Sequence, residues 1–287
     1  MTSNYYLNGS IGYTLLVNQN IKILILSDMH SELPYCKKNG VFVSEWFKKK
    51  YKSKILLEEV PRSLATLKEL WPSSIHTQKL KEVYLNNSNI IHGLDIRPEL
   101  IPFSLELAFE KEAPSVNLKE YLNLMDLFFT LKLKFIQDNL NYIYTTNFLK
   151  TNNLGQHYIN LKKKVKHFVK KYKNQLNKNI KNLIKNDDIF LNQTNDLTSE
   201  IMEWYSIAKI IQGINKNITS FILHAGLAHT TNIIKLLKLY YGYTIKEEFG
   251  ITDMDHLNLN KVITGCLPLP NHIEKQFGGC KLLDFLT

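Results

Sequence analysis

Two apolar segments, far apart in the chain, each lead directly into small and polar residues that include histidines. They are residues 21–30 and residues 219–229. Apolar runs of this length predict buried strands, and the carboxyl ends of parallel strands meet at one edge of an α/β sheet, where ligands normally bind. We therefore expect four polar side chains to converge at that edge: Asp28, His30, His224 and His229.

The remaining pattern alternates strand and helix signals around these two segments. Residues 5–17 read as a β-hairpin, because Asn8-Gly9 is a turn signal. Further strands are predicted at 54–59, 89–95, 243–249, 262–264 and 282–286, and helices at 40–51, 64–70, 77–85 and 228–241. This alternation predicts an α/β fold with a mainly parallel central sheet flanked by helices.

The middle of the chain has almost no strand signal between residues 118 and 185. Apolar residues recur there at steps of three or four, as in Leu161, Val165, Phe168 and Tyr172, which is typical of amphipathic helices. Two long helices joined near residues 151–155 predict a helical hairpin, followed by a helix over 199–214 with Thr198 or Ser199 as its N-cap. We expect one compact domain, in which residues 1–115 and 198–287 form the core and 116–197 the helical insertion.

The composition, with 44% hydrophobic and 22% charged residues, is that of a globular protein. The most apolar long stretch, residues 121–136, contains Asp126, Lys132 and Lys134. Three charges in such a stretch make it a poor membrane span. We therefore expect no membrane-spanning segment.

The three cysteines, Cys36, Cys266 and Cys280, show no CxxC spacing. An odd number of cysteines without a framework pattern favours a reducing compartment such as the cytoplasm, with free thiols or one pair.

The net charge of +10 is concentrated between Lys162 and Lys185. Lysines on one face of a helix form either a solvated surface or a contact site for a polyanion. The sequence leaves both interpretations open.

Polar residues also follow two other predicted strands. Glu58 and Glu59 end the strand at 54–59, and only one of them is expected to face a site, because neighbouring strand residues point to opposite faces. That carboxylate can ligate a metal, act as a base, pair with Arg62 or cap the next helix. Asp95 and Arg97 can form a bidentate pair or clamp a substrate anion.

The segment after the late strand carries the strongest signal. Its small residues, Gly226 among them, permit close approach of a substrate to the backbone. His229 falls in the first turn of the next helix, where the helix dipole favours the neutral imidazole that a ligand or a base requires. Asn232 lies one turn further and can orient His229 or a substrate, and His224 is a candidate for substrate binding. A helix-capping turn is the alternative interpretation.

Asp28 and His30 offer either metal ligands or a base with its orienting partner, unless Asp28 only stabilises a turn. The metal interpretation predicts a divalent transition ion held by Asp28, His30, Glu58 and His229. Five other histidines have no comparable setting and are interpreted as surface or packing residues: His76, His157, His167, His256 and His272.

Together these motifs resemble the erythromycin esterase-like, ChaN-like and TraB/Tiki superfamily. The matching segments are Ser27-Asp-Met-His30, Leu57-Glu-Glu59, Asp95-Ile-Arg97 and Gly226-Leu-Ala-His229. The resemblance implies an α/β core with helical insertions and a working centre of His30 and His229 with Glu58 or Glu59. Ser27-Asp28 stands where that group usually has Gly-Glu or Gly-Thr.

Residues 23–30 and the late histidine-rich turn also resemble calcineurin-like metallophosphoesterases. The middle motifs of that family, which hold two metals about 3.5–4 Å apart, are missing from this sequence.

The expected function is thus hydrolysis of a small-molecule or peptide substrate by an esterase-like or metal-dependent enzyme. His30 or His229 is the base or ligand, Glu58 or Glu59 assists, and Arg97 contacts substrate. The alternatives are a non-enzymatic binding protein that uses the basic helix, and a phosphoesterase.

Overall fold

The computed structural model describes residues 5–37, 39–49, 53–58, 75–86, 91–97, 117–129 and 154–277. The chain divides into two compact units. The sheet unit comprises Met1–Val60, Trp71–Leu94 and Gly213–Thr287, and the helical unit comprises Pro61–Leu70 and Asp95–Gln212. The predicted insertion, residues 116–197, lies within the helical unit.

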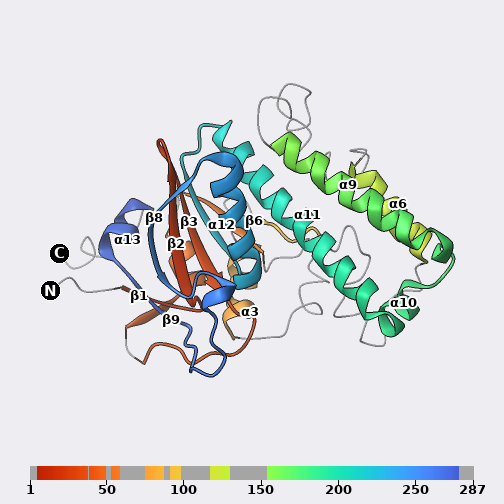
Figure 1. Ribbon diagram of the computed structural model, residues 1–287. Helices are drawn as coiled ribbons and strands as arrows, with labels where there is room; N and C mark the ends of the chain where they lie inside the picture. Colours follow the sequence, from red (N-terminus) through yellow and green to blue (C-terminus); the bar gives the residue numbers. More distant parts are fainter. Residues whose placement is uncertain are drawn as a thin grey trace, which may run out of the picture. The chain divides into compact units, whose positions relative to one another are not determined.

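A six-stranded sheet forms the centre of the sheet unit, in the order β6-β5-β7-β3-β2-β8 (Figure 1). Its strands are β2 (Gly12–Asn18), β3 (Ile21–Asp28), β5 (Lys54–Leu57), β6 (Ile91–Gly93), β7 (Ser220–Gly226) and β8 (Thr244–Gly250). Neighbouring strands are parallel from β6 through β5 and β7 to β3, whereas β2 runs antiparallel to both β3 and β8. The predicted α/β class with a mainly parallel sheet is confirmed.

The central strands are continuous apolar runs, as expected for strands that are covered on both faces. In β3, Ile23 to Leu26 are all fully buried, and in β7 Phe221 to Leu223 are too. The helices of this unit are α1 (Val43–Phe47), α3 (Ile75–Asn86), α12 (Leu227–Tyr241) and α13 (Asn271–Gln276), with the short 3-10 helix η2 (Met254–His256). Helix α12 follows β7 directly and packs on β7 and β3.

The predicted hairpin over residues 5–17 is wrong. Strand β1 (Tyr5–Asn8) belongs to a second, three-stranded sheet, between β4 (Gly40–Phe42) and β9 (Cys266–Leu269). Gly9, with a φ of +107°, follows β1 and leads the chain from one sheet to the other. The Asn8-Gly9 signal therefore marked a real turn, but the partners of β1 come from distant segments that local sequence does not reveal.

Two further local predictions are corrected. The predicted helix over 40–51 begins instead as strand β4, which pairs with β1, and only then becomes α1. The strand predicted at 262–264 is irregular, and β9 follows it. The helix predicted at 64–70 and the strand at 282–286 lie outside the described residues.

The helical unit contains α6 (Leu118–Phe129), α9 (Leu154–Tyr172), η1 (Lys173–Gln175), α10 (Ile180–Asn186) and most of α11 (Asp188–Ile214). The apolar stripe predicted for α9 is buried as expected. The helix predicted at 199–214 starts earlier, because the side chain of Asp187 accepts a hydrogen bond from the Phe190 amide and caps α11. Thr198, the predicted cap, instead donates its hydroxyl to the Thr194 carbonyl inside the helix.

Cys36 and Cys266 form a disulfide in the sheet unit, across 230 positions of sequence. A disulfide is typical of oxidising environments, which is at odds with the predicted reducing compartment; that assignment stays a prediction. Among the helices within the described ranges, none is long and apolar enough to cross a membrane.

Candidate functional site

Three strand ends lie side by side at the carboxyl edge of the parallel sheet, because β7 pairs with β5 on one side and β3 on the other. Leu57 pairs with His224, and Asp28 pairs with Gly226. This register brings Glu58, which follows β5, next to the ends of β7 and β3. The convergence expected from the sequence is therefore a consequence of strand order and register.

The Glu58 carboxylate is the centre of the first cluster at this edge. Its side chain is 1% exposed, and its Oε2 accepts a hydrogen bond from the Gly226 amide at 2.7 Å. Its Oε1 lies 3.3 Å from Nε2 of His229 and 4.0 Å from Nε2 of His30. One carboxylate oxygen thus contacts both of the imidazoles that the sequence singled out.

Gly226 allows this arrangement, because it ends β7 and is the N-cap of α12. A Cβ atom at this position would lie 3.1 Å from Nε2 of His30 and 3.5 Å from Oε2 of Glu58. The small residue therefore makes room for protein side chains. The start of α12 is also tied to the sheet, because the hydroxyls of Ser27 and Thr230 are 2.9 Å apart and hydrogen-bonded.

A second cluster lies beside the first and contains Asp28, His76 and His224. Oδ2 of Asp28 is 3.6 Å from Nε2 of His76, which is in turn 3.3 Å from Nε2 of His224. The same Asp28 oxygen is 3.5 Å from Nδ1 of His30, so Asp28 connects the two clusters.

His76 is the residue that sequence reasoning missed. The sequence predicts a surface or packing residue at this position, and the structure shows a side chain that is 3% exposed and contacts Asp28 and His224. It comes from α3, whose sequence carries no motif at this point. Burial lowers the pKa of His76 well below its usual range, and the imidazoles of His224 and His30 lower it further. The ring is therefore neutral near pH 7, the form that ligates metals and accepts protons.

Exposure separates the six side chains into two groups. His30 is 24% exposed and His229 is 12% exposed, so both can meet a molecule from solution. The other four are at most 3% exposed: Asp28, Glu58, His76 and His224. These buried groups can orient the imidazoles or hold an ion, but not contact a large substrate.

Five further residues were predicted to belong to the site. Asp95 and Arg97, in the helical unit, form a bidentate pair, with Nε to Oδ1 at 2.8 Å and Nη2 to Oδ2 at 3.0 Å. This is the structural pairing that the sequence allowed. Asn232 is exposed on α12. Glu59 and Arg62 lie outside the described residues.

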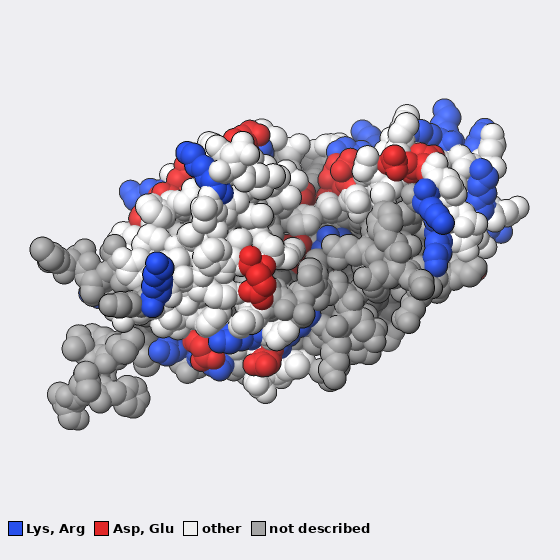
Figure 2. All heavy atoms as spheres, turned by 90° about the horizontal axis from the view of Figure 1, so that it is seen from below, with Lys and Arg blue, Asp and Glu red and all other residues white. Residues whose placement is uncertain are grey.

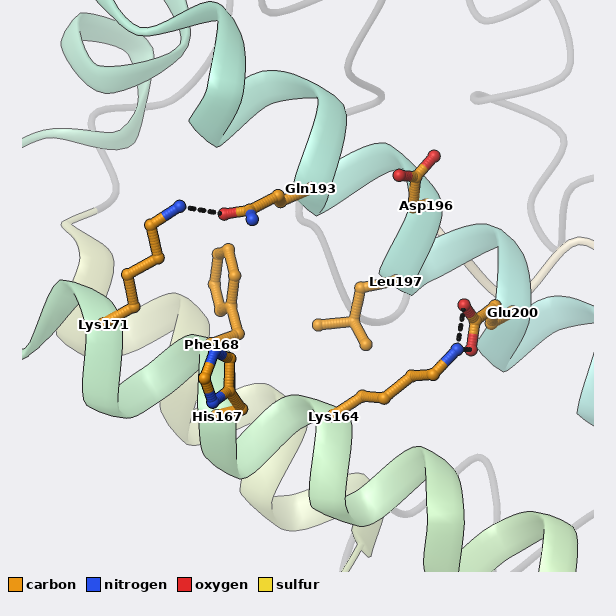
Figure 3. Close-up of a pocket in the computed structure, with 8 residues that line it drawn as sticks. All are labelled: Lys164, His167, Phe168, Lys171, Gln193, Asp196, Leu197 and Glu200. Carbon is orange, nitrogen blue, oxygen red and sulfur yellow. Dashed lines mark hydrogen bonds and ion pairs between the residues drawn. The ribbon is translucent and has the colours of Figure 1, made fainter.

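The lysines of α9 lie on its exposed face, opposite the buried stripe. Figure 2 shows Lys and Arg side chains over the helical unit, with Asp and Glu side chains among them. A hollow of about 250 Å³ is lined by side chains of α9 and α11 (Figure 3). At its rim, Lys164 pairs with Glu200 and Lys171 donates to Gln193, so these two lysines join the helices to each other.

Comparison with known proteins yields no relative: no family model, curated protein or solved structure matches this chain.

Proposed function

We propose that this protein is a hydrolase whose working centre is the Glu58 carboxylate with the imidazoles of His30 and His229. The single observation that carries the proposal is that Oε1 of Glu58 lies within 4.0 Å of Nε2 of both imidazoles. A buried carboxylate that orients a partly exposed imidazole is an arrangement used for general base catalysis.

In the proposed mechanism, Glu58 orients His229. The Gly226 amide holds Oε2 of Glu58, which leaves Oε1 to accept the Nε2–H of His229. This fixes the proton of His229 on Nε2, so that Nδ1 is the basic nitrogen of the ring and the proposed acceptor of a proton from an attacking water. His30, beside the same oxygen, donates a proton to the leaving group.

Two considerations support a water nucleophile. The Ser27 hydroxyl, next to Asp28, is fully buried and hydrogen-bonded to Thr230, so it is unsuited to attack a substrate. Asp28, which stands where the resembled superfamily usually has Glu or Thr, contacts His30 and His76 and therefore serves to orient imidazoles.

The resemblance to the erythromycin esterase-like, ChaN-like and TraB/Tiki superfamily points to the same three residues, His30, His229 and Glu58. We therefore propose esters or amides of small molecules or peptides as the substrate class.

The test is a screen of p-nitrophenyl esters, an aryl amide and an aryl phosphate, with and without Mn²⁺. We expect ester or amide hydrolysis that falls about 10²- to 10⁴-fold in His229→Gln and in Glu58→Gln. His272→Gln, at an exposed histidine, is the matched control. Unchanged turnover in His229→Gln would refute the assignment, and Mn²⁺-dependent cleavage of the phosphate alone would favour the phosphoesterase alternative.

A second candidate function is polyanion binding through α9, favoured by the exposed lysines on that helix. Binding of a polyanion such as heparin or RNA is expected to weaken steeply with salt. Lys166→Glu/Lys170→Glu should weaken it more than Lys246→Glu/Lys261→Glu, which changes the net charge equally in the sheet unit. Absent or salt-insensitive binding would exclude this function.

A further inference from the structure

We propose that Asp28, His76 and His224 form a binding site for one divalent transition-metal ion, with Zn²⁺ or Co²⁺ as the fitting ions. This ligand set differs from the one expected from the sequence, which placed a metal on Asp28, His30, Glu58 and His229. The role of the ion rests on the proposed hydrolase function, but its binding does not.

The spacing of the ligand atoms fits such an ion. One oxygen of Asp28 and one nitrogen from each histidine all lie within 4.8 Å of one another. Atoms that each lie about 2.0–2.1 Å from a tetrahedral ion are about 3.3 Å apart. The observed separations of 3.3 Å between the two Nε2 atoms and 3.6 Å from Asp28 to His76 are close to this value.

The chemistry of the donors selects the class of ion. Two imidazoles and one carboxylate suit Zn²⁺ and its first-row neighbours, whereas Mg²⁺ and Ca²⁺ prefer oxygen ligands alone. Three protein ligands also leave a position open, which is typical of catalytic zinc sites and unlike the closed four-ligand structural sites.

Burial of the three ligands is independent evidence for a bound ion. The three side chains are 1%, 3% and 0% exposed, in chain order. Placing a carboxylate and two imidazoles together away from water is costly unless their charges and lone pairs are matched. A divalent cation matches all three at once, because it offsets the carboxylate charge and accepts a lone pair from each ring.

The ligands are held on separate rigid elements. Asp28 ends β3 and His224 lies on β7, and these strands are hydrogen-bonded neighbours. His76, on α3, is packed against Gly9, where a Cβ atom would lie only 2.0 Å from Nδ1 of the ring. The site is thus held in place by the fold, which favours selective metal binding.

The proposed ion lies beside the hydrolase centre. Oδ2 of Asp28, one of its ligands, is 3.5 Å from Nδ1 of His30, and His30 shares Glu58 with His229. An ion at this place can polarise a substrate oxygen or a water next to these imidazoles.

Metal binding is tested directly on the full chain, by elemental analysis after dialysis with Zn²⁺ and by visible spectroscopy with Co²⁺. We expect one ion per chain and the intense d–d absorption of a low-coordinate Co²⁺ site. His76→Gln and His224→Gln should weaken binding more than about 100-fold, because loss of outer-shell partners alone already costs 10- to 100-fold. His157→Gln, at a buried histidine in the helical unit, is the matched control.

Asp28→Cys covers the case in which a glutamine variant fails to fold. A cysteine ligand should give a thiolate-to-cobalt charge-transfer band that the wild type lacks. Substoichiometric metal in the wild type, equal binding in His76→Gln, or an Asp28→Cys protein without this band would overturn the site and leave a metal-free hydrogen-bonded cluster.

His229→Gln separates this proposal from the proposed function. It should keep the metal, because His229 is not a ligand, while it loses hydrolysis. If the protein binds one metal ion per chain but neither the wild type nor any variant hydrolyses a substrate, the metal site is supported and the hydrolase is refuted. Hydrolysis that is unchanged in His76→Gln and by chelation supports the hydrolase and refutes a catalytic role of the ion, whereas the site itself is refuted by the binding outcomes above.

Discussion

Gly226→Ala tests the proposed hydrolase centre without removing any of its functional groups. The added methyl group would lie 3.1 Å from Nε2 of His30 and 3.5 Å from Oε2 of Glu58. The second distance is an ordinary contact, whereas the first requires His30 to move by a few tenths of an ångström. His30 is partly exposed, so its ring can move away from the added methyl group at little cost, which changes its contact with Glu58.

The effect on stability should be small. Gly226 has a φ of −57° and a ψ of 146°, which alanine adopts without strain. Alanine is a poorer N-cap than glycine, by about 0.5–1 kcal/mol, but it reduces the entropy of the unfolded chain by a similar amount, about 0.4–1 kcal/mol. These opposite effects leave the free energy of unfolding within about 1 kcal/mol of the wild type.

Activity should change more than stability. A displacement of 1 Å costs about 100-fold in rate, so a shift of a few tenths of an ångström should lower kcat/KM about 3- to 10-fold. The assay is hydrolysis of the best ester from the substrate screen, together with urea unfolding of the same preparation.

Gly242→Ala is the matched control for this comparison. Gly242 ends α12 at a φ of +69° and has open space around it, with the nearest atom 3.6 Å from an added Cβ. Alanine there should cost about 1 kcal/mol of stability through its left-handed conformation and leave activity unchanged. Equal activity in Gly226→Ala and the wild type would refute the role of the His30–Glu58 contact.

Three further predictions concern stability and the thiols. Gly9→Ala should lower the free energy of unfolding by at least about 2 kcal/mol in urea titrations, because a positive φ is combined with a clash against His76; a neutral result would show that the His76 ring is not fixed there. Burial lowers the pKa of His157 to about 4, against about 6.5 when unfolded, so the unfolded chain binds more protons between these values. The stability contributed by neutral His157 is therefore complete above pH 6.5 and is lost as the pH falls towards 4, by about 3 kcal/mol at most. Between pH 7 and pH 5, the free energy of unfolding in urea should fall less for His157→Gln than for the wild type. An equal fall in both proteins would contradict the lowered pKa of His157. Because Cys36 and Cys266 are paired, thiol titration of the unreduced, denatured protein should find one reactive thiol. Three thiols would favour the predicted reducing compartment.

Much of the fold was predictable because the central strands are buried on both faces. Such strands are unbroken apolar runs, and β3, β5 and β7 were all predicted within a few residues of their observed bounds. The buried apolar stripe of α9 was likewise predicted, from the spacing of its apolar residues. Buried positions recur at a regular spacing in strands and helices, so the local sequence indicates where these elements lie, and the class of fold follows from them.

The sequence also indicated the edge of the sheet at which Asp28, His30, Glu58, His224 and His229 meet. That inference required only that the strands be parallel. It left open whether Glu58 or Glu59 faces the site, and the structure places Glu58 there, on the Gly226 amide.

Only the tertiary structure decided the rest, because these features depend on which distant segments pair. The partners of β1 lie at residues 40–42 and 266–269, and no local signal specifies such long-range register. His76 lies on a helix without a motif, yet the packing of α3 brings it to 3.3 Å from His224. Hydrophobic periodicity is a property of neighbouring residues, whereas a site of this kind is a property of strand order and helix placement, which a single sequence does not record.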